Sequence, residues 1–353
     1  MLLLNPGSTS TKLALFVNNQ SLFTENIAHR ATELEACGPI TKQYSLRKKA
    51  ILDKVATKNI SLSSLAAIVG RGGLTKPLTG GTYLVNQRMV EDLKSAKWGD
   101  HASNLGPVLA YELAREGGGI PAFTVDPVVV DELDDLARLS GLPGLPRQSK
   151  FHALNQKAVA RRAAKALARP YEELNLIVAH MGGGISIGAH KKGLVVDVNN
   201  ALDGEGPMTP ERSGTLPVGD LVRLCYSGRY SKTELLRMVK GSGGLRAHLG
   251  TTDARKVEEM IKNGDKKAEL VFQALAYQVA KNICALMATF SGKVDAIALT
   301  GGMANSQLLT VWIKSQVDFL APVLVYPGES EMEALAQGAL RVLRGEEMAR
   351  EYI

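Results

Sequence analysis

The sequence predicts an α/β protein of two lobes, and three observations support this prediction. At 353 residues the chain is longer than one hydrophobic core usually organises, so two lobes are the default expectation. Apolar runs typical of strands alternate with long helical stretches. A strand–turn–strand pattern near the N-terminus returns about half a chain length later, which indicates an ancient duplication of one α/β unit. We therefore expect two similar lobes that face each other.

The first copy of the repeated pattern lies at the N-terminus. Leu2–Leu4 is an apolar run, a polar turn follows it, and alternation resumes over Lys12–Phe16. A turn of glycine and small hydroxyl residues lets backbone N–H groups approach a phosphate, and a nearby lysine can neutralise its charge. An ordinary hairpin with polar turn residues remains open. The chain has no Gly-x-x-x-x-Gly-Lys-Ser/Thr sequence, so a Walker-type loop is excluded.

The second copy lies near the middle of the chain. The apolar run Leu176–Ala179 is broken by His180–Gly184 and continues at Ile185–Gly188. Three successive glycines stand where side chains would block a ligand from the backbone. We expect this turn to contact phosphate, with a tight hairpin as the alternative.

A third strand and turn follow closer to the C-terminus. Ala296–Thr300 is rich in residues typical of strands, and Gly301-Gly302 opens a turn that runs through Asn305 into a helix, Gln307–Ile313. Such a turn could let a flat ring lie against the backbone, although a simple strand-to-helix turn explains it equally well.

The remaining segments complete an alternating α/β pattern. A strand is predicted at Val323–Tyr326, and a helix at Glu331–Leu343 begins with the glutamates that suit a helix N-terminus. Asn155–Leu167 and Lys267–Phe290 are further predicted helices. Gly141–Pro146 is the clearest break near the middle and predicts the approach to a hinge.

Composition and charge narrow the classes of protein to which the chain can belong. Hydrophobic residues make up 45% and charged residues 22%, as in ordinary globular proteins. The net charge is +7, but basic residues are spread along the chain and aromatic residues are only 5%. This pattern favours anionic small molecules over nucleic acid as ligands. The cysteines Cys37, Cys225 and Cys284 lack the paired spacing of a zinc or redox site.

The chain shows no sequence signal for export or for a membrane. No apolar run approaches the roughly 20 residues that a membrane helix needs, and Met1–Leu4 continues into Asn5-Pro6-Gly7 without a signal-peptide pattern. We expect a cytoplasmic protein with neither a membrane nor a nucleic-acid partner.

Three motifs carry a resemblance to acetate and butyrate kinases. Asn5–Lys12 resembles their N-terminal phosphate motif, Ala179–Ser186 their second phosphate motif, and Leu299–Ser306 their adenosine motif. The motifs stand in the family's order, and the resemblance extends over nearly the whole chain. Further similar segments are Gly70–Gly73, Asp100–Asn104, Val125–Pro127, Lys150–Asn155 and Asp203–Gly214. The short length, Gly-Arg-Gly-Gly around Arg71 and the Met-Thr-Pro-Glu-Arg-Ser-Gly segment are similar to the butyrate kinase branch of the acetokinase family.

The resemblance implies the fold of the acetate and sugar kinase/Hsp70/actin superfamily. This fold has two duplicated, ribonuclease H-like lobes around an ATP cleft. We expect the N-terminal lobe to contain residues 1–148 and 332–353, with the first phosphate loop and part of the acyl site. Residues 149–331 then form the C-terminal lobe, with the second phosphate loop and the adenosine motif.

The resemblance also implies an activity, the reversible ATP-dependent phosphorylation of butanoate to butanoyl phosphate. A carboxylic acid is ionised at neutral pH, so its oxygen can attack the γ-phosphoryl group without a general base. ATP and Mg²⁺ are the implied cofactors, and a homodimer or higher homo-oligomer is the implied assembly. Isobutyrate, acetate or propionate remain open as the acid. A sugar-type kinase that acts on a hydroxyl group and a non-catalytic actin- or Hsp70-like ATP-binding protein are the alternatives of another class.

Matching positions in the family's motifs imply the roles of individual residues. Arginines are expected to hold the carboxylate and the transferring phosphoryl group because guanidinium presents a planar fork of donors; a structural salt bridge is the alternative reading. The implied catalytic residues are Arg71, Asp126, His152, His180 and Arg212, and the acyl site adds His101 to the two arginines. The implied nucleotide contacts are Asn5, Gly7, Ser8, Thr9, Ser10, Lys12, His180, Gly182, Gly183, Gly184, Gly301, Gly302 and Asn305. Asn5 and Glu331 are implied at the metal, with Glu329 and Glu333 open as alternatives to Glu331.

Overall fold

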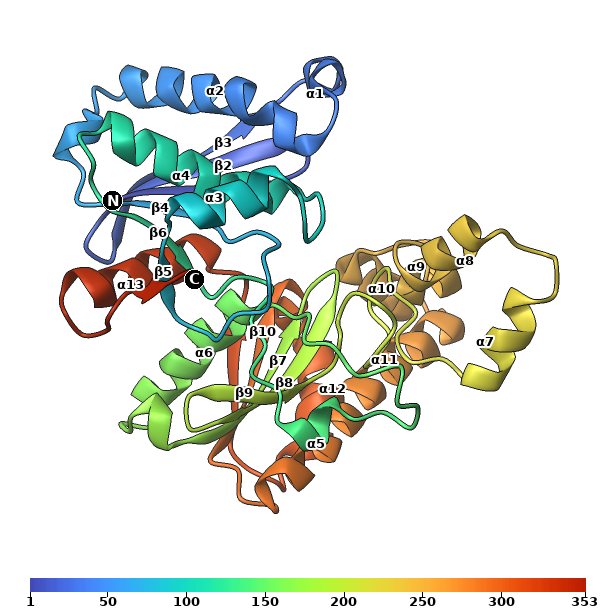
Figure 1. The fold of residues 1–353 in the computed structure, drawn as a ribbon. Coiled ribbons are helices and arrows are strands. Elements are labelled where there is room, and N and C mark those ends of the chain that lie inside the picture. Colours follow the sequence, from blue (N-terminus) through green and yellow to red (C-terminus); the bar gives the residue numbers. More distant parts are fainter. The chain divides into compact units, whose positions relative to one another are not determined.

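The computed structural model describes residues 1–353, which divide into two compact units (Figure 1). The first unit contains Met1–Val130 and Ser330–Ile353, and the second contains Asp131–Glu329. Each unit is built around one β-sheet with its own helices. The chain therefore leaves the first unit once and returns to it for its last helix.

The boundary near the middle of the chain differs from the predicted one after residue 148. Residues 131–148 belong to the second unit because they are bonded there; for example, Arg147 pairs with Asp197 at 2.9 Å. The Gly-Leu-Pro-Gly-Leu-Pro segment Gly141–Pro146, predicted as the approach to a hinge, accordingly lies inside the second unit. The return to the first unit at Ser330 comes two residues before the predicted boundary.

The first unit holds a seven-stranded sheet in the order β12-β5-β6-β4-β1-β2-β3. Its strands are β1 (Leu2–Pro6), β2 (Ser10–Val17), β3 (Gln20–Ala28), β4 (Ile68–Gly70), β5 (Thr82–Leu84), β6 (Ala122–Val125) and β12 (Arg350–Glu351). Its helices are α1 (Ala31–Cys37), α2 (Tyr44–Thr57), α3 (Gln87–Lys94), α4 (Leu105–Glu116) and α13 (Glu331–Leu343), with the 3-10 turns η1 (Ile40–Gln43), η2 (Leu62–Ser64) and η3 (Ala102–Asn104).

The second unit holds a five-stranded sheet in the order β11-β10-β7-β8-β9. Its strands are β7 (Asn175–Met181), β8 (Ile185–Lys191), β9 (Leu194–Val198), β10 (Ala296–Gly301) and β11 (Val323–Pro327). Its helices are α5 (Asp135–Arg138), α6 (Ala153–Ala166), α7 (Val218–Cys225), α8 (Lys232–Val239), α9 (Gly244–Leu249), α10 (Ala254–Lys262), α11 (Lys266–Leu286) and α12 (Gln307–Val317), with the 3-10 turns η4 (Tyr171–Glu173), η5 (Met287–Phe290) and η6 (Gly302–Asn305).

The two sheets repeat one strand order. β6-β4-β1-β2-β3 in the first sheet corresponds to β11-β10-β7-β8-β9 in the second. β1 and β2 form an antiparallel hairpin, as do β7 and β8, and β1 pairs in parallel with β4 as β7 does with β10. This match is what a duplicated α/β unit predicts. The strands and helices predicted from the apolar runs are all present within a few residues of their predicted bounds.

Each sheet is covered by helices because its central strands are apolar on both faces. In β7, Ile177 and Ala179 pack with α11 and α12, whereas Leu176 and Val178 pack with α6. In the first unit, α2 and α4 pack in one core with Leu2 and other residues of the sheet, and α13 contacts β1, β4 and β6.

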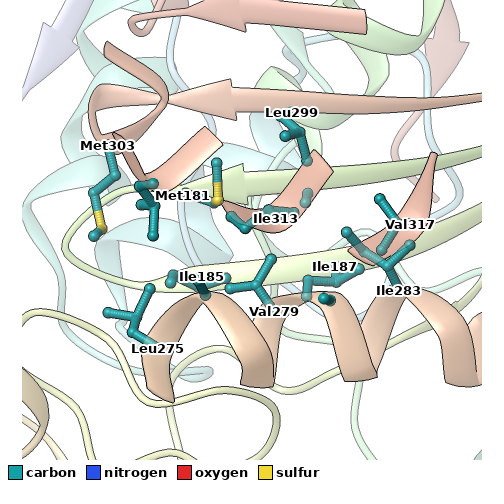
Figure 2. Packing of buried hydrophobic residues seen from close by; sticks show 14 of the residues in the cluster. Met181, Ile185, Ile187, Leu275, Val279, Ile283, Leu299, Met303, Ile313 and Val317 are labelled. Carbon is teal, nitrogen blue, oxygen red and sulfur yellow. The ribbon is translucent and has the colours of Figure 1, made fainter. Parts of the chain in front are cut away.

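The helix α11 is the centre of the second unit's core. Leu275, Val279 and Ile283 are spaced four residues apart, so they form one stripe along the helix, and they face Ile185 and Ile187 of β8 (Figure 2). All five side chains are almost completely buried. The stripe anchors the strand that follows the second glycine-rich turn.

One helix is long and apolar enough to be compared with a membrane span. By length and apolar composition alone, the 25 residues Lys266–Phe290 could cross a membrane. The same segment contains α11, whose buried stripe packs in the core described above. The core of a globular unit is therefore a sufficient explanation of its apolar character.

Candidate functional site

The β1–β2 loop is the first of the predicted phosphate loops. β1 and β2 are buried strands, and the N–H of Gly7 closes the turn between them by donating to Ser10 O at 2.8 Å. Ser8 and Thr9 are exposed at the tip. The loop thus presents small hydroxyl residues on a short turn of the chain.

A fully buried arginine supports this loop from the helix α2. Arg47 donates to Ser8 O at 3.0 Å and to Ser10 O at 2.9 Å. It also donates to Thr11 Oγ1 and to Gln43 Oε1, so none of these bonds goes to a carboxylate. Burial lowers the pKa of the Arg47 guanidinium, which nevertheless stays charged because its ordinary pKa lies far above neutrality. Arg47 could not be predicted from the sequence, since nothing distinguishes it from the lysines that follow it.

Three predicted site residues from distant parts of the chain meet in the first unit. Asn5 Nδ2 donates to Glu331 Oε2 at 2.6 Å, and Arg71 NH2 lies 2.9 Å from Glu331 Oε1. Asn5 is the second-last residue of β1, and Arg71 directly follows the parallel neighbour β4, so both lie at the same edge of the sheet. Lys12 lies directly opposite Asn5 on β2 with an exposed side chain. We call Asn5, Arg71 and Glu331 the Asn5 cluster.

The three glutamates proposed as alternatives at the metal occupy different surroundings. Glu331 begins α13 and joins the Asn5 cluster. Glu333 is an exposed residue of the first turn of α13. Glu329 belongs to the second unit, where its Oε1 lies 3.4 Å from His180 Nε2. Among the three, Glu331 alone is bonded to other predicted site residues of the first unit.

Asp126 follows β6 and is built into a turn. Its Oδ1 accepts the Gly81 N–H at 2.7 Å, and its own N–H donates to Gly81 O at 3.0 Å. The residue is buried and has a positive φ of 38°, which is unusual for a residue with a side chain. These contacts explain Asp126 as a structural residue of the turn. The catalytic role that the resemblance implies for it stays a prediction.

His101, predicted near the acyl pocket, caps the short turn η3. Its Nδ1 accepts the Ser103 N–H at 3.2 Å and lies 2.8 Å from Ser103 Oγ. Because Nδ1 accepts a bond from the backbone, a neutral His101 carries its proton on Nε2. The ring is exposed.

The β7–β8 loop, the second predicted phosphate loop, is shaped by Arg212. A Cβ on Gly184 would lie 2.2 Å from the Arg212 NH1, so only glycine lets the guanidinium lie against this loop. Thr209 Oγ1 donates to Gly183 O at 2.7 Å and accepts the Arg212 N–H at 3.0 Å. Thr209 therefore joins the arginine's own backbone to the glycine loop.

The Arg212 guanidinium is only partly satisfied within the chain. NH1 donates to Ala201 O, whereas Nε is buried without a hydrogen-bond partner. Burial lowers the pKa of Arg212, and the nearby carboxylates of Glu211 and Asp203 oppose this effect. A partly buried cation with a buried, unused Nε donor fits an anionic ligand, because such a ligand would satisfy both the charge and the hydrogen bond.

Two predicted histidines stack on each other in the second unit. The rings of His152 and His180 lie 4.2 Å apart between centroids, at an interplanar angle of 28°. His180 is almost fully buried, and its Nδ1 has no hydrogen-bond partner. His152 Nδ1 lies 2.9 Å from Ser186 Oγ. Ser186 is opposite His180 in the β7–β8 pair. This position explains why the His152 ring contacts both residues.

The third loop begins where β10 ends, beside the second loop. Gly301 has a φ of 93°, and a Cβ there would lie 2.4 Å from Met181 O, so glycine is required by the neighbouring strand. Gly302 has open space around its Cα. Asn305 Nδ2 donates to Gly302 O at 2.9 Å. These contacts explain the turn, and a contact with adenosine stays a prediction.

The structure thus gathers the predicted residues into groups within each unit. Asn5, Arg71 and Glu331 meet in the first unit. His152 and His180 stack in the second unit. The supporting residues were missed because their contacts join segments far apart in the sequence: Arg47, Gln156, Tyr171, Ser186, His190 and Thr209.

Comparison with known proteins gives a full-length relative. The model of the acetokinase family matches residues 144–321. Butyrate kinase 2 from Clostridium acetobutylicum is 54% identical over 352 residues, which cover 100% of this chain and 99% of that protein.

Solved structures show the same fold at much lower identity. The acetate kinase of Porphyromonas gingivalis has a TM-score of 0.80 at 20% identity and covers 97% of this chain and 99% of its own. A propionate kinase from Francisella tularensis has a TM-score of 0.74 at 21% identity, with 96% and 98% covered. The chain therefore has the fold of the acetate and sugar kinase/Hsp70/actin superfamily, as the motifs imply.

Proposed function

Because the chain belongs to the acetokinase family, we propose that it phosphorylates the carboxylate of a short-chain fatty acid with ATP, butanoate + ATP = butanoyl phosphate + ADP. The observation that carries this proposal is the 54% identity to a butyrate kinase over the whole chain. The reaction is reversible, since it exchanges one phosphoric anhydride for another.

The site residues support a carboxylate as the acceptor. The attacking oxygen is already ionised, so the protein has to hold two anions in line and stabilise the charge of a loose transition state. Arg212 suits this role because its Nε is a buried donor without a partner in the chain. Arg71 is the corresponding candidate of the first unit, although Glu331 neutralises it in this structure. We assign the carboxylate and the transferring phosphoryl group to these arginines.

The histidines are proposed to donate hydrogen bonds to the phosphoryl oxygens. His180 Nδ1 is a buried polar atom without a partner, and His152 lies stacked against the same ring. A donor that is already in place when negative charge develops stabilises a transition state without reorganisation. His101 is proposed to lie at the acyl group.

The nucleotide is proposed to bind the glycine-rich loops of both units, with magnesium at the Asn5 cluster. Mg²⁺ in phosphate sites is usually held by one or two protein oxygens and keeps several waters. Asn5 and Glu331 supply such oxygens, and no group of three or more His, Cys, Asp or Glu side chains forms a closed metal site. When bound, the ion neutralises charge on the phosphates, while Arg71 and Asn5 hold the Glu331 carboxylate in position.

A sugar-type kinase is the alternative of another class. It needs a carboxylate base to activate a hydroxyl group. Asp126 and Asp203 are the two candidates for this base. The Asp126 Oδ1 accepts the Gly81 N–H in a buried turn, and Asp203 Oδ2 pairs with Lys150 at 3.1 Å. These contacts favour the carboxylate acceptor. A cytoplasmic location and a homo-oligomeric assembly are further parts of the proposal.

The test is to incubate the purified protein with Mg-ATP and hydroxylamine, which traps acyl phosphates as hydroxamates. Acetate, propionate, butyrate, isobutyrate, valerate and glycerol are offered in parallel. We expect hydroxamate to be highest with a four- or five-carbon acid and to be lost in Arg212→Ala. ADP formed with glycerol, and no hydroxamate from any acid, would overturn the proposal.

A further inference from the structure

A row of buried polar side chains ends on the His152 ring in the second unit. It contains Tyr171, His190, Gln156 and Ser186, and we call it, with His152, the Tyr171–His152 chain. We propose that its hydrogen bonds all point toward His152 and hold the proton of the neutral ring on Nε2. The effect on phosphoryl transfer rests on the proposed function, whereas the position of the proton does not.

The contacts of the chain are continuous. The Tyr171 hydroxyl lies 2.8 Å from His190 Nδ1, and His190 Nε2 lies 2.9 Å from Gln156 Oε1. Gln156 Nε2 lies 2.7 Å from Ser186 Oγ, which in turn lies 2.9 Å from His152 Nδ1. All are normal hydrogen-bond distances. Gln156, Ser186 and His190 are fully buried, so each polar atom needs its partner.

The fold makes room for this chain. Ser186 and His190 lie on the same face of β8, since side chains alternate along a strand. Gly188 lies between them on that face, and a Cβ there would be 2.4 Å from Gln156 Oε1. Gln156 and His152 are one helical turn apart at the start of α6. The glycine therefore leaves the space that the Gln156 amide occupies.

The direction of the hydrogen bonds follows from a backbone carbonyl. Gln156 Nε2 donates to Ser186 O at 3.0 Å. A carbonyl can only accept, so this bond places the amide nitrogen toward Ser186 and the amide oxygen toward His190. His190 Nε2 must then be the donor to Gln156 Oε1.

His190 is neutral, and this determines that its Nδ1 carries no proton. Complete burial lowers the pKa of His190 well below its ordinary value, and the charges of Lys157 and Arg161 lower it further. A neutral ring with its proton on Nε2 has a lone pair on Nδ1. The Tyr171 hydroxyl is therefore the donor to His190 Nδ1, and the first two bonds of the chain point the same way.

The last hydrogen bond determines which nitrogen of neutral His152 carries the proton. Ser186 Oγ receives the Gln156 Nε2–H and a long contact from the His152 backbone N–H at 3.5 Å. Among the groups bonded to Ser186 Oγ, His152 Nδ1 is the one that can accept. The serine proton accordingly points to Nδ1, and neutral His152 has its own proton on Nε2.

This arrangement would matter for a phosphate ligand. With the opposite tautomer, the lone pair of Nε2 would face a negatively charged oxygen. The chain makes Nε2 a donor before any ligand binds, so no rotation or proton exchange is needed during the reaction. Gln156, Ser186, His190 and Tyr171 are positioning residues that act through His152.

The first test determines which nitrogen of His152 carries the proton, and it needs no activity assay. In protein labelled with ¹⁵N-histidine, a long-range ¹⁵N–¹H spectrum distinguishes the two tautomers of a neutral ring, and His152→Gln identifies the His152 signal. We expect the proton on Nε2 in the wild type and a mixture of tautomers in Ser186→Ala. A proton on Nδ1 of wild-type His152 would overturn the proposal.

The second test measures turnover in the hydroxamate assay. We expect Ser186→Ala to lower kcat by about 10-fold or more with little change in the KM of either substrate, as for other residues that orient a functional histidine. In a His152→Asn background, Ser186→Ala should cause no further loss, because it acts through His152. An equal loss in both backgrounds would show that Ser186 has only a structural role.

A milder variant covers the case in which Ser186→Ala does not fold. Tyr171→Phe removes only the first donor, and we expect a smaller loss of kcat. Tyr83→Phe is its matched control, since both tyrosines are 4% exposed and Tyr83 donates a hydrogen bond to Thr79 O in the first unit. Equal kcat values in the two variants would show that Tyr171 does not act through the Tyr171–His152 chain. If the wild type forms no hydroxamate from any acid, the proposed function fails, and the tautomer of His152 still decides this inference.

Discussion

The hairpin loops at equivalent positions of the two sheets are supported in different ways. The β1–β2 loop is held through its carbonyl groups by Arg47, a buried side chain of α2. The β7–β8 loop is held by Thr209 and Arg212, which come from the segment after β9. A duplicated topology therefore preserves the position of a loop, while each copy has its own source of positive charge.

Arg212 should have the largest effect on turnover. Arg212→Ala removes a partly buried cation that the proposed function places at the transferring phosphoryl group, and we expect kcat/KM to fall by about 100- to 1,000-fold. Gly184→Ala should approach this loss, because its Cβ would lie 2.2 Å from Arg212 NH1. Gly7→Ala tests the other loop, where the Cβ would lie no closer than 3.6 Å to another atom of the chain, so we expect a smaller loss that arises only from the proposed nucleotide contact. Equal activity of the two alanine variants would contradict the proposed difference between the loops.

Arg47 should affect both stability and nucleotide binding. Arg47→Gln leaves the carbonyl groups of Ser8 and Ser10 without their buried donor, and we expect a loss of about 3 kcal/mol in the free energy of unfolding. The KM for ATP should rise more than kcat falls, since the loop loses its shape and a nearby positive charge. Denaturant titration and initial rates measure these effects. Lys49→Gln, at an exposed position of the same helix, should change neither.

Glu331 should affect the dependence on magnesium. In Glu331→Gln we expect the Mg²⁺ concentration for half-maximal rate to rise by about 10-fold, because a charged oxygen near the phosphates is lost. Glu333→Gln is the matched control on the same helix turn, where the side chain is exposed. The assignment of Glu331 to the metal would be wrong if both variants showed the wild-type magnesium dependence.

The smallest expected effect is on the pH dependence of stability. His190 is neutral in the folded protein because burial lowers its pKa, whereas in the unfolded chain its pKa is near 6.5. Below pH 6.5 the unfolded chain binds a proton that the folded protein does not, so stability falls as the pH falls. The slope contributed by one histidine is at most about 1.4 kcal/mol per pH unit. Denaturant titrations from pH 7 to pH 5 should show a shallower slope in His190→Gln, and an unchanged slope would exclude this histidine as the cause.

The two glycine loops also show where the sequence can be overinterpreted. Three successive glycines were explained by the approach of a ligand to the backbone. The structure shows that Gly184 is required by Arg212, and Gly301 in the third loop is required by Met181. Gly302 has open space around it, and a Cβ on Gly183 would make only an ordinary contact with Glu211 at 3.6 Å, so both remain compatible with the ligand explanation. A glycine motif indicates close packing, but the partner can belong to the same chain.

Much of the architecture could be predicted because its signals are local. Strands such as β1 and β7 are short apolar runs ended by turn residues, and α13 begins at the predicted Glu331. The motifs implied that Asn5 and Glu331 lie at the metal and that Arg71 holds the substrate, and the structure places the three side chains in one cluster. The extent of each unit was harder to predict, since residues 131–148 are assigned by contacts such as Arg147 with Asp197.

The order of the elements, the repeated strand–turn–strand pattern and the family can all be inferred from the amino-acid sequence. Which side chains support the site depends on contacts that form only when the chain folds. Arg47 lies within a basic helix, and Gln156 and His190 are 34 positions apart in the sequence. Their importance comes from burial and from hydrogen bonds between segments, and periodicity and turn chemistry carry no information about either. The direction of the Tyr171–His152 chain likewise follows from one carbonyl group whose position only the folded chain defines.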